Sequence, residues 1–399
     1  MKLYSSRVYL PDGCASAAID VQGQAIADIE RVDACPSDAI NYGTQRIIPG
    51  IFDTHNHGTQ GFDLMEPRDE EAYDRTVRGY LKGLASQGTV NVFPTVMSPA
   101  GIAAVARAAE SDDVDGANIR GIHSEGPWLS RVGEKGIRTG WPEVSLNTAK
   151  AMVKAGGGML RLVALAPEIP GIMELVDYFL NEGITVAAAH SDNKYAAAQA
   201  AYERGISVAT HTGNVMTDMH HRDVGGLGAA LLNDDVMCEV ICDGMHICNE
   251  MLKIYFRVKS TDKFMMISDC TAFSGAPTGT YTSEMAPTIN VTDQGFVLTD
   301  TGRLMGSSQS VLYGISNLVE HVGIPLEDCL KMASLNPAIK YGLSDRTGTI
   351  EVSKNADLVV ISDDWKVRAT YARGKKVYDY SEEGSVFNQD FVEAHLKRD

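Results

Sequence analysis

The sequence lacks the features that mark secreted and membrane-spanning chains. Its seven cysteines are an odd number and form no Cys-x-x-Cys pair, which argues against a disulfide framework. No stretch approaches the ~20 uninterrupted apolar residues that a membrane span needs. The first residues, Met1 to Arg7, lack the apolar segment and the small-residue cleavage site of a signal peptide. We therefore expect a cytoplasmic protein without membrane contacts.

Positive charge is also scarce. The chain has 35 Lys and Arg against 52 Asp and Glu, a formal net charge of −17. Binding to nucleic acid depends on clustered basic side chains, so we expect no nucleic-acid partner. An anionic small substrate would need a local basic site. The sequence also shows no internal repeat and no low-complexity segment.

What the chain does contain is a set of apolar segments that end in metal-binding side chains. The first, residues 49–58, ends in His55-Asn-His57, and alternate residues at a strand end face the same way, so one ion could take both imidazoles. Any one such residue has an ordinary structural explanation, but their joint placement predicts a metal centre at the C-terminal mouth of a barrel. The further residues placed in this way are Glu125, His190, His211, His246 and Asp269.

Strand-like and helix-like segments alternate through the middle of the chain, which predicts an α/β fold, a (β/α)8 TIM-type barrel. Eight alternations over ~220 residues fit a barrel better than a doubly wound sheet. We expect strands at Arg46–Phe52, Val90–Thr95, Ile119–Ser124, Arg161–Ala166, Thr185–Ala189, Ser207–Thr210, Met237–Ile241 and Phe264–Ser268. We expect helices at Glu70–Gln87, Ala100–Glu110, Ser145–Ala155, Gly171–Glu182, Lys194–Arg204 and Asn249–Lys259.

Both ends of the chain carry short alternating segments typical of hairpins, and we expect them to pair into one small β-sandwich domain. The expected organisation is a β-sandwich from residues 1–48 and 347–381 and a barrel from residues 49–346. Residues 382–399 then form a C-terminal tail, either a terminal helix or a loose segment.

Imidazole nitrogens and carboxylate oxygens together suit Zn²⁺ or a similar divalent ion with a position left open for water. Such an ion lowers the pKa of that water and can polarise a substrate carbonyl. Asp269 would act as the general base and, once protonated, as the acid that serves the leaving amine. His123, two residues before Glu125, lies deeper in its strand, and we expect a structural role for it.

These motifs resemble the amidohydrolase superfamily, and within it the N-acetylglucosamine-6-phosphate deacetylase family. The resemblance covers nearly the whole chain. Its most specific parts are Glu-Gly-Pro at 125–127 and Ala-Pro-Glu at 166–168, whereas His-x-His is common to the superfamily. It implies a metal-dependent hydrolase that removes the acetyl group from a small phosphorylated amino sugar, an N-acetyl-hexosamine 6-phosphate such as N-acetylglucosamine 6-phosphate.

The resemblance also implies a division of the metal ligands. Glu125, His190 and His211 would hold the principal ion, and His55 and His57 would hold a second ion bridged through Glu125. We therefore expect one or two divalent metal ions per subunit, with zinc first and then Fe, Mn or Co.

Further roles follow from the same resemblance. His246 would contact the sugar or polarise the acetyl carbonyl, and Asp269 would activate the water, so these two are the expected catalytic residues. Arg222 matches the arginine that in relatives reaches the phosphate across a dimer interface, which implies a homodimer. The implied substrate-binding residues are Asn214, Val215, Arg222, His246 and Met305.

The chain departs from the family pattern in the pocket. The stretch that usually reads His-Leu-Phe-Asn-Ala-Met is His-Thr-Gly-Asn-Val-Met at 211–216, and 270–274 replaces a plainer small-residue run. The particular sugar and its phosphate therefore stay open, and N-acetylgalactosamine 6-phosphate is a second candidate substrate. Two other functions stay open. One is that of an N-acyl-amino-acid or dihydroorotase-like hydrolase, and the other is that of a non-catalytic member of the superfamily. A cyclic-amide hydrolase would usually carry a metal-bridging lysine after strand four, where this chain has Leu-Ala-Pro-Glu at 165–168.

Overall fold

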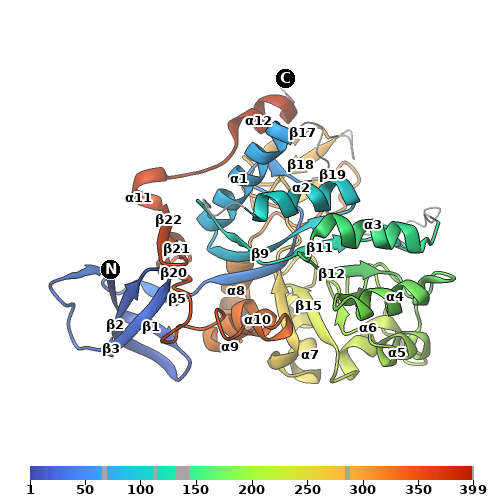
Figure 1. Ribbon diagram of the computed structural model, residues 1–399, viewed down its shortest axis with the longest axis horizontal. Helices are drawn as coiled ribbons and strands as arrows, with labels where there is room; N and C mark the ends of the chain where they lie inside the picture. The colour runs from blue at the N-terminus through green and yellow to red at the C-terminus, as the bar shows by residue number, and fades with distance from the viewer. Residues whose placement is uncertain (65–69, 111–114, 132–142, 284–287, 398–399) are drawn as a thin grey trace.

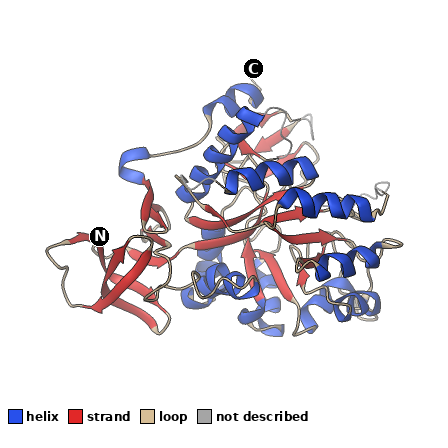
Figure 2. Ribbon diagram, viewed as in Figure 1, coloured by secondary structure: helices blue, strands red, loops and turns tan. Residues whose placement is uncertain are grey.

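The structure is a computed structural model that describes residues 1–64, 70–110, 115–131, 143–283 and 288–397 (Figure 1). A barrel of parallel strands is surrounded by helices, and a separate β-sheet domain lies to one side of it (Figure 2). Among the described residues, no helix has the length and apolar character that crossing a membrane requires.

Eight parallel strands form the barrel, as the sequence predicts. Short β10 (Asn118–Ile119) also pairs with β9, just before β11 begins. The ring closes where the backbone N–H of Asp269, after the last strand, donates to the carbonyl of His55 in the first, at 2.9 Å. The strands are β6 (Ile51–Asn56), β9 (Thr89–Val96), β11 (Ile122–Glu125), β12 (Leu160–Leu165), β13 (Thr185–Ala188), β14 (Val208–Ala209), β15 (Met237–Ile241) and β16 (Phe264–Ile267).

Helices cover the outside of this barrel (Figure 1). The sequence explains their starts and faces: Ser98 caps α2 by accepting from the N–H of Gly101, and α4 buries Ile172, Leu175 and Phe179, which recur at helical spacing. The main helices are α1 (Glu70–Ser86), α2 (Pro99–Ala109), α3 (Leu146–Gly156), α4 (Ile172–Asn181), α5 (Tyr195–Glu203), α6 (Gly225–Leu232), α7 (Asn249–Val258) and α8 (Val311–Asn317).

The remaining helical segments follow α7 and α8 and close the chain. They include one 3₁₀ turn and two π-helical turns. These segments are η1 (Thr261–Lys263), η2 (Leu318–Val322), α9 (Leu326–Leu330), η3 (Lys331–Leu335), α10 (Asn336–Lys340), α11 (Tyr380–Glu383) and α12 (Gln389–His395).

The barrel interior has an apolar layer with a polar layer above it. Phe52, Phe93 and Val208 belong to one buried cluster inside the barrel. Alternate residues of a strand face the same side, so the residues two positions further along these strands also point inward. Those residues and their neighbour on β15 are polar and fully buried: Thr54, Thr95, Thr210 and Glu239. The polar layer therefore lies directly below the strand ends.

The separate domain is one connected sheet built from both ends of the chain, with the strand order β22-β21-β20-β5-β1-β2-β3 and β4 beside β1. Its buried side chains, such as Leu3, Ile19 and Leu358, form a core of their own. The strands are β1 (Lys2–Leu10), β2 (Gly13–Gln22), β3 (Ala25–Arg31), β4 (Ala39–Asn41), β5 (Arg46–Pro49), β20 (Leu358–Ile361), β21 (Val367–Ala372) and β22 (Lys375–Asp379).

Two expected strands are wrong in their extent. Ile119–Ser124 is interrupted at residues 120–121, between β10 and β11. Arg46–Phe52 is divided at Gly50 between two sheets: β5 pairs with β20, and β6 begins the barrel. Gly50 donates its N–H to the carbonyl of Asp357, and a side chain there would collide with Val90. The glycine thus allows the close approach at which the chain passes from one domain to the other.

Two small sheets complete the fold. β7 (Gly58–Thr59) pairs with β8 (Phe62–Asp63) just after the barrel's first strand. A three-stranded sheet is formed by β17 (Gly279–Tyr281), β18 (Ile289–Val291) and β19 (Val297–Thr299). Phe387 and Phe391 pack with Phe273 and Tyr281 beside it, so the end of the chain is anchored by aromatic contacts.

Candidate active site

The C-terminal ends of the barrel strands bring five of the sequence-predicted metal ligands together. Glu125 ends β11, and His55 lies near the end of β6. These residues form two groups of possible ligands that share Glu125, and within each group the ligand atoms lie within 4.8 Å of one another. The two groups are His55, His57 and Glu125, and Glu125, His190 and His211.

The carboxylate of Glu125 lies between the two histidine pairs. Its Oε1 atom is 3.0 Å from Nε2 of His190 and 3.2 Å from Nε2 of His211, and its Oε2 atom is 3.1 Å from Nε2 of His57. The Nε2 atoms within each pair also face each other, at 3.2 Å for His55 and His57 and 3.1 Å for His190 and His211. Nitrogen lone pairs that converge in this way fit a cation, so the donor set suits one or two divalent ions.

The outer nitrogens of two of these rings are held by backbone carbonyls. Nδ1 of His190 donates to the carbonyl of Arg131 at 2.7 Å, and Nδ1 of His211 donates to that of Asn214 at 3.2 Å. A proton on Nδ1 leaves the Nε2 lone pair free for a metal ion. Asn214, an expected substrate residue, therefore also orients a ligand.

Asp269 faces the first histidine pair. Its Oδ1 atom lies 3.4 Å from Nε2 of His55 and 3.4 Å from Nε2 of His57. Burial alone would raise the pKa of this carboxyl, but the two histidines lower it well below its usual value. Burial lowers the pKa of His57, yet hydrogen bonds with Asp269 and Glu125 raise it to about 9. Asp269 is thus ionised and faces the histidines as a carboxylate.

The backbone is strained at three of these residues. The φ values are 51° at Asp269, 48° at His190 and 29° at His211. These lie in or near the left-handed region, which residues other than glycine rarely adopt. Asp269 is held there by two backbone hydrogen bonds of 2.9 Å, one to His55 and one from Ser307. Such strain clusters at functional sites, where the surrounding structure holds residues in place.

His123 lies against the metal site from below. Its ring contacts that of His55 edge-on, with centroids 4.5 Å apart, and its Nδ1 atom is 3.1 Å from the hydroxyl of Thr95. Burial lowers the pKa of His123 well below its usual value, so the ring is neutral. It supports His55 by packing.

The expected substrate residues lie in different parts of the mouth. His246 is fixed by Asp243, whose Oδ2 atom accepts from its Nδ1 at 2.7 Å. Val215 is adjacent to Asn214 and has a φ of 51°. Arg222 is exposed on the loop before α6, with its guanidinium 2.7 Å from Nε2 of His221. Met305 packs beside the aromatic cluster of the small sheet. Among the described residues, no hydrogen bond or ion pair joins Arg222 or Met305 to the metal ligands.

One departure from the family pattern has a structural cause. Gly213 has a φ of 98°, and a side chain there would collide with the hydroxyl of Tyr255 on α7. Tyr255 therefore occupies the space beside the loop that carries His211 and Asn214, which together with the positive φ favours glycine at position 213.

Sequence reasoning gave no role to three carboxylates that support the site, of which Asp53 and Glu239 are buried and Glu168 is half-buried. Asp53 accepts from the Ser268 hydroxyl at 2.5 Å, which ties β6 to the end of β16, and burial raises its pKa to about 6. Glu168 accepts from the Ser191 hydroxyl at 2.8 Å, next to His190. Glu239 lies inside the barrel. Each is an acidic residue within or just after an apolar run, and that is the signal that could have revealed it.

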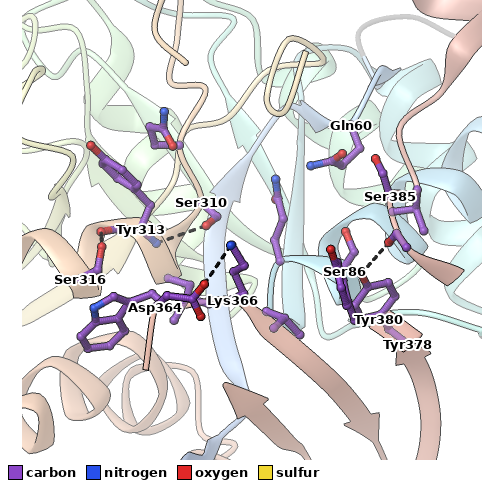
Figure 3. A pocket seen from close by; sticks show the side chains of 17 residues that line it. Gln60, Ser86, Ser310, Tyr313, Ser316, Asp364, Lys366, Tyr378, Tyr380 and Ser385 are labelled. Atoms are coloured by element: carbon purple, nitrogen blue, oxygen red, sulfur yellow. Dashed lines mark hydrogen bonds and ion pairs between the residues drawn. The ribbon is translucent and has the colours of Figure 1, made fainter. Parts of the chain in front are cut away.

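A cavity lies away from these ligands. It has a volume of 560 Å³ and is lined by Trp365 and Tyr378 of the sheet domain, Tyr313 of α8 and residues near the chain end. Figure 3 shows Tyr313 and Tyr378 among the side chains around it. Asp364 and Lys366 form an ion pair in it at 2.8 Å. None of the residues that line it is a predicted ligand or catalytic group, so it is distinct from the metal site.

Comparison with known proteins gives consistent results over nearly the whole chain. A model of the amidohydrolase family matches residues 46–377. An N-acetylglucosamine-6-phosphate deacetylase from Vibrio furnissii is 33% identical over 372 residues, which cover 92% of this chain and 91% of that protein.

Solved structures agree with this. An N-acetylglucosamine-6-phosphate deacetylase from Pasteurella multocida superposes with a TM-score of 0.82 and 26% identity, over 94% of this chain and 99% of that one. A mutant deacetylase from Mycobacterium smegmatis, in complex with N-acetyl-D-glucosamine-6-phosphate, gives a TM-score of 0.83 and 25% identity, over 94% and 99%. The chain therefore belongs to the amidohydrolase family, among the N-acetylglucosamine-6-phosphate deacetylases.

Proposed function

We propose that the protein hydrolyses the acetamide bond of N-acetylglucosamine 6-phosphate and releases acetate and the free amine. The observation that carries this proposal is the Glu125 carboxylate between two histidine pairs, with Asp269 Oδ1 at 3.4 Å from one of them. A convergent N/O donor set next to an ionised carboxylate is what metal-assisted amide hydrolysis requires.

The proposal includes one or two divalent ions per subunit, with zinc as the first candidate. His190 and His211 with Glu125 would hold one ion, and His55 and His57 with the same carboxylate would hold the other. A bound ion would polarise the acetyl carbonyl and make a water molecule more acidic. Fe, Mn and Co accept the same donors, so metal analysis decides the identity.

The protein's own residues supply the proton transfers. Asp269 accepts a proton from the attacking water, and the water oxygen bonds to the acetyl carbon. Asp269 then gives that proton to the sugar nitrogen as the carbon–nitrogen bond breaks. His246 donates from Nδ1 to Asp243, which leaves its Nε2 as an acceptor, so its proposed role is to bind a hydroxyl group of the sugar.

Recognition of the sugar phosphate is proposed for the loop after β14 and its surroundings. Asn214, Val215, His246 and Met305 would contact the sugar. Arg222 is exposed on this loop. Its bidentate guanidinium suits the phosphate of a substrate that is bound in the neighbouring subunit. The proposed assembly is therefore a homodimer.

A cyclic-amide hydrolase on the same scaffold is disfavoured by the end of β12. The segment after Leu165 carries Glu168 in place of a bridging lysine, and that carboxylate accepts from the Ser191 hydroxyl. It holds the loop of His190 and is not free to bridge two ions.

The test is acetate release from a matched panel of substrates: N-acetylglucosamine and N-acetylgalactosamine, each with and without the 6-phosphate, and an N-acetyl amino acid. Enzyme stripped with a chelator and reloaded with Zn²⁺, Mn²⁺ or Fe²⁺ is assayed on each. We expect the highest kcat/KM on N-acetylglucosamine 6-phosphate and no turnover without metal. Faster turnover of the N-acetyl amino acid would overturn the substrate assignment, and full activity after chelation would overturn the metal mechanism.

A further inference from the structure

The carboxylate of Glu239 is buried inside the barrel and has one oxygen without a partner. Glu239 is 0% exposed and comes from the middle of β15. Its Oε1 atom accepts from the Thr54 hydroxyl at 2.9 Å, while its Oε2 atom has no hydrogen-bond partner among the described residues. A buried carboxylate oxygen without a donor is costly, so an unmet donor is expected next to it.

That donor is the outer nitrogen of His55. Nδ1 of His55 is also buried without a hydrogen-bond partner in the described ranges, and it lies 3.7 Å from Oε2 of Glu239. The opposite nitrogen of the same ring, Nε2, faces the carboxylates of Glu125 and Asp269 at 3.6 and 3.4 Å. A neutral ring that offers Nε2 to a metal ion carries its proton on Nδ1, and this proton needs an acceptor.

The rings of His190 and His211 show what is missing at His55. Their Nδ1 atoms each reach a backbone carbonyl, at 2.7 and 3.2 Å. Within the part of the chain that the structure describes, Nδ1 of His55 reaches no such carbonyl, and the acidic group beside it is Glu239. At 3.7 Å the pair is just beyond hydrogen-bond distance, and a small rotation of the imidazole would close the gap.

We propose that Glu239 is a positioning residue, which accepts the Nδ1 proton of His55 and so turns Nε2 toward the second metal position. The proposal rests on the ligand set proposed above and extends it by one residue on a different strand. Because Glu239 pairs with the ring of His55, we expect its influence to be confined to the ion held by His55 and His57.

The decisive measurement is metal binding, made separately from turnover. Chelator-stripped wild type, Glu239→Leu and Glu239→Gln are titrated with Zn²⁺ against a coloured competitor, and metal content is measured after dialysis. We expect wild type to bind two equivalents. In Glu239→Leu we expect one equivalent to bind as in wild type and the other about 10- to 100-fold more weakly, the usual effect of losing a partner of a metal ligand.

Glu239→Gln keeps the shape and an acceptor oxygen but loses the charge, so its second affinity should lie between those of wild type and Glu239→Leu. If Glu239→Leu does not fold, the second zinc affinity of Glu239→Gln still tests the proposal. Thr210→Val is the matched control, because the Thr210 hydroxyl is buried in the same polar layer without a hydrogen-bond partner among the described residues. We expect both of its zinc affinities to equal those of wild type.

Wild-type zinc affinities in both Glu239 variants would overturn the proposal, as would an equal loss in Thr210→Val, which would show a general effect of the polar layer. A wild-type protein that binds only one equivalent would also overturn it. That last result leaves the deacetylase proposal standing, because acetate release measures the function independently.

Discussion

Glu125 meets His57 through Oε2 and Nε2 at 3.1 Å, while its other oxygen faces the histidines that follow β13 and β14. One carboxylate is thus shared by both groups of ligands. The histidine pairs, in contrast, each belong to one group. Loss of the carboxylate should therefore affect the whole centre, and loss of a pair only part of it.

Glu125→Ala should lower both metal content and the rate of acetate release, because both ions lose a ligand. The double variant His55→Ala with His57→Ala should lose at most one equivalent and keep the ion at His190 and His211. Inductively coupled plasma analysis of the dialysed proteins measures this. Full occupancy in Glu125→Ala would contradict its role as a ligand.

Asp269→Asn should keep the metal but lose turnover by about 10²- to 10⁴-fold, since the amide fills the same space and cannot accept a proton. Metal content and kcat measured on the same sample separate the two effects. Near-normal kcat in a variant with full metal content would remove Asp269 from the mechanism.

The barrel is predictable from the sequence because each strand is a short apolar run followed by a helix with periodic apolar positions. The prediction fails where these rules fail. Gly50 ends one strand and begins another within a single apolar run, and only the close approach of Val90 reveals the break. Helix α6 (Gly225–Leu232) escapes prediction because it contains three glycines; it is stabilised by burial of nearly every residue.

The site residues at the strand ends can be predicted from the sequence, but those inside the barrel are harder to predict. The ligands could be found one strand at a time, since each histidine or carboxylate follows an apolar run. Glu239 stands out in the same way as an acidic residue in an apolar run, but its role could not be predicted, because that role depends on Thr54, 185 residues away in the chain, and on His55 beside it. Such pairs across the barrel are set by strand register, which a single sequence does not contain.

Lys340 gives a pH prediction away from the metal. Its ammonium donates to the Ser207 hydroxyl at 2.7 Å, and burial lowers its pKa to about 8, below the ~10.4 of an unfolded lysine. The unfolded chain therefore binds more protons between these values, so the free energy of unfolding gains a contribution that rises with pH from about 8 to ~10.4. Lys340→Met should lack this rise, so the difference in stability between the two proteins should shift in favour of wild type across that range. Urea denaturation at several pH values measures the difference, and parallel curves would contradict the lowered pKa.

The phosphate gives the last prediction, because a protein with a net charge of −17 needs a local cation to bind an anionic substrate. Arg222 is exposed beside His220 and His221, and no hydrogen bond or ion pair among the described residues joins it to the metal centre of its own chain. We expect Arg222 to bind the phosphate of the substrate held in the neighbouring subunit. Arg222→Ala should then raise KM for N-acetylglucosamine 6-phosphate by about 10- to 100-fold, the effect of losing a charge-assisted hydrogen bond. The same variant should act on unphosphorylated N-acetylglucosamine as wild type does, since the chemistry is untouched. An equal loss on both sugars would show that Arg222 is structural, and a protein that sediments as a monomer at assay concentration would refute its action across a dimer interface.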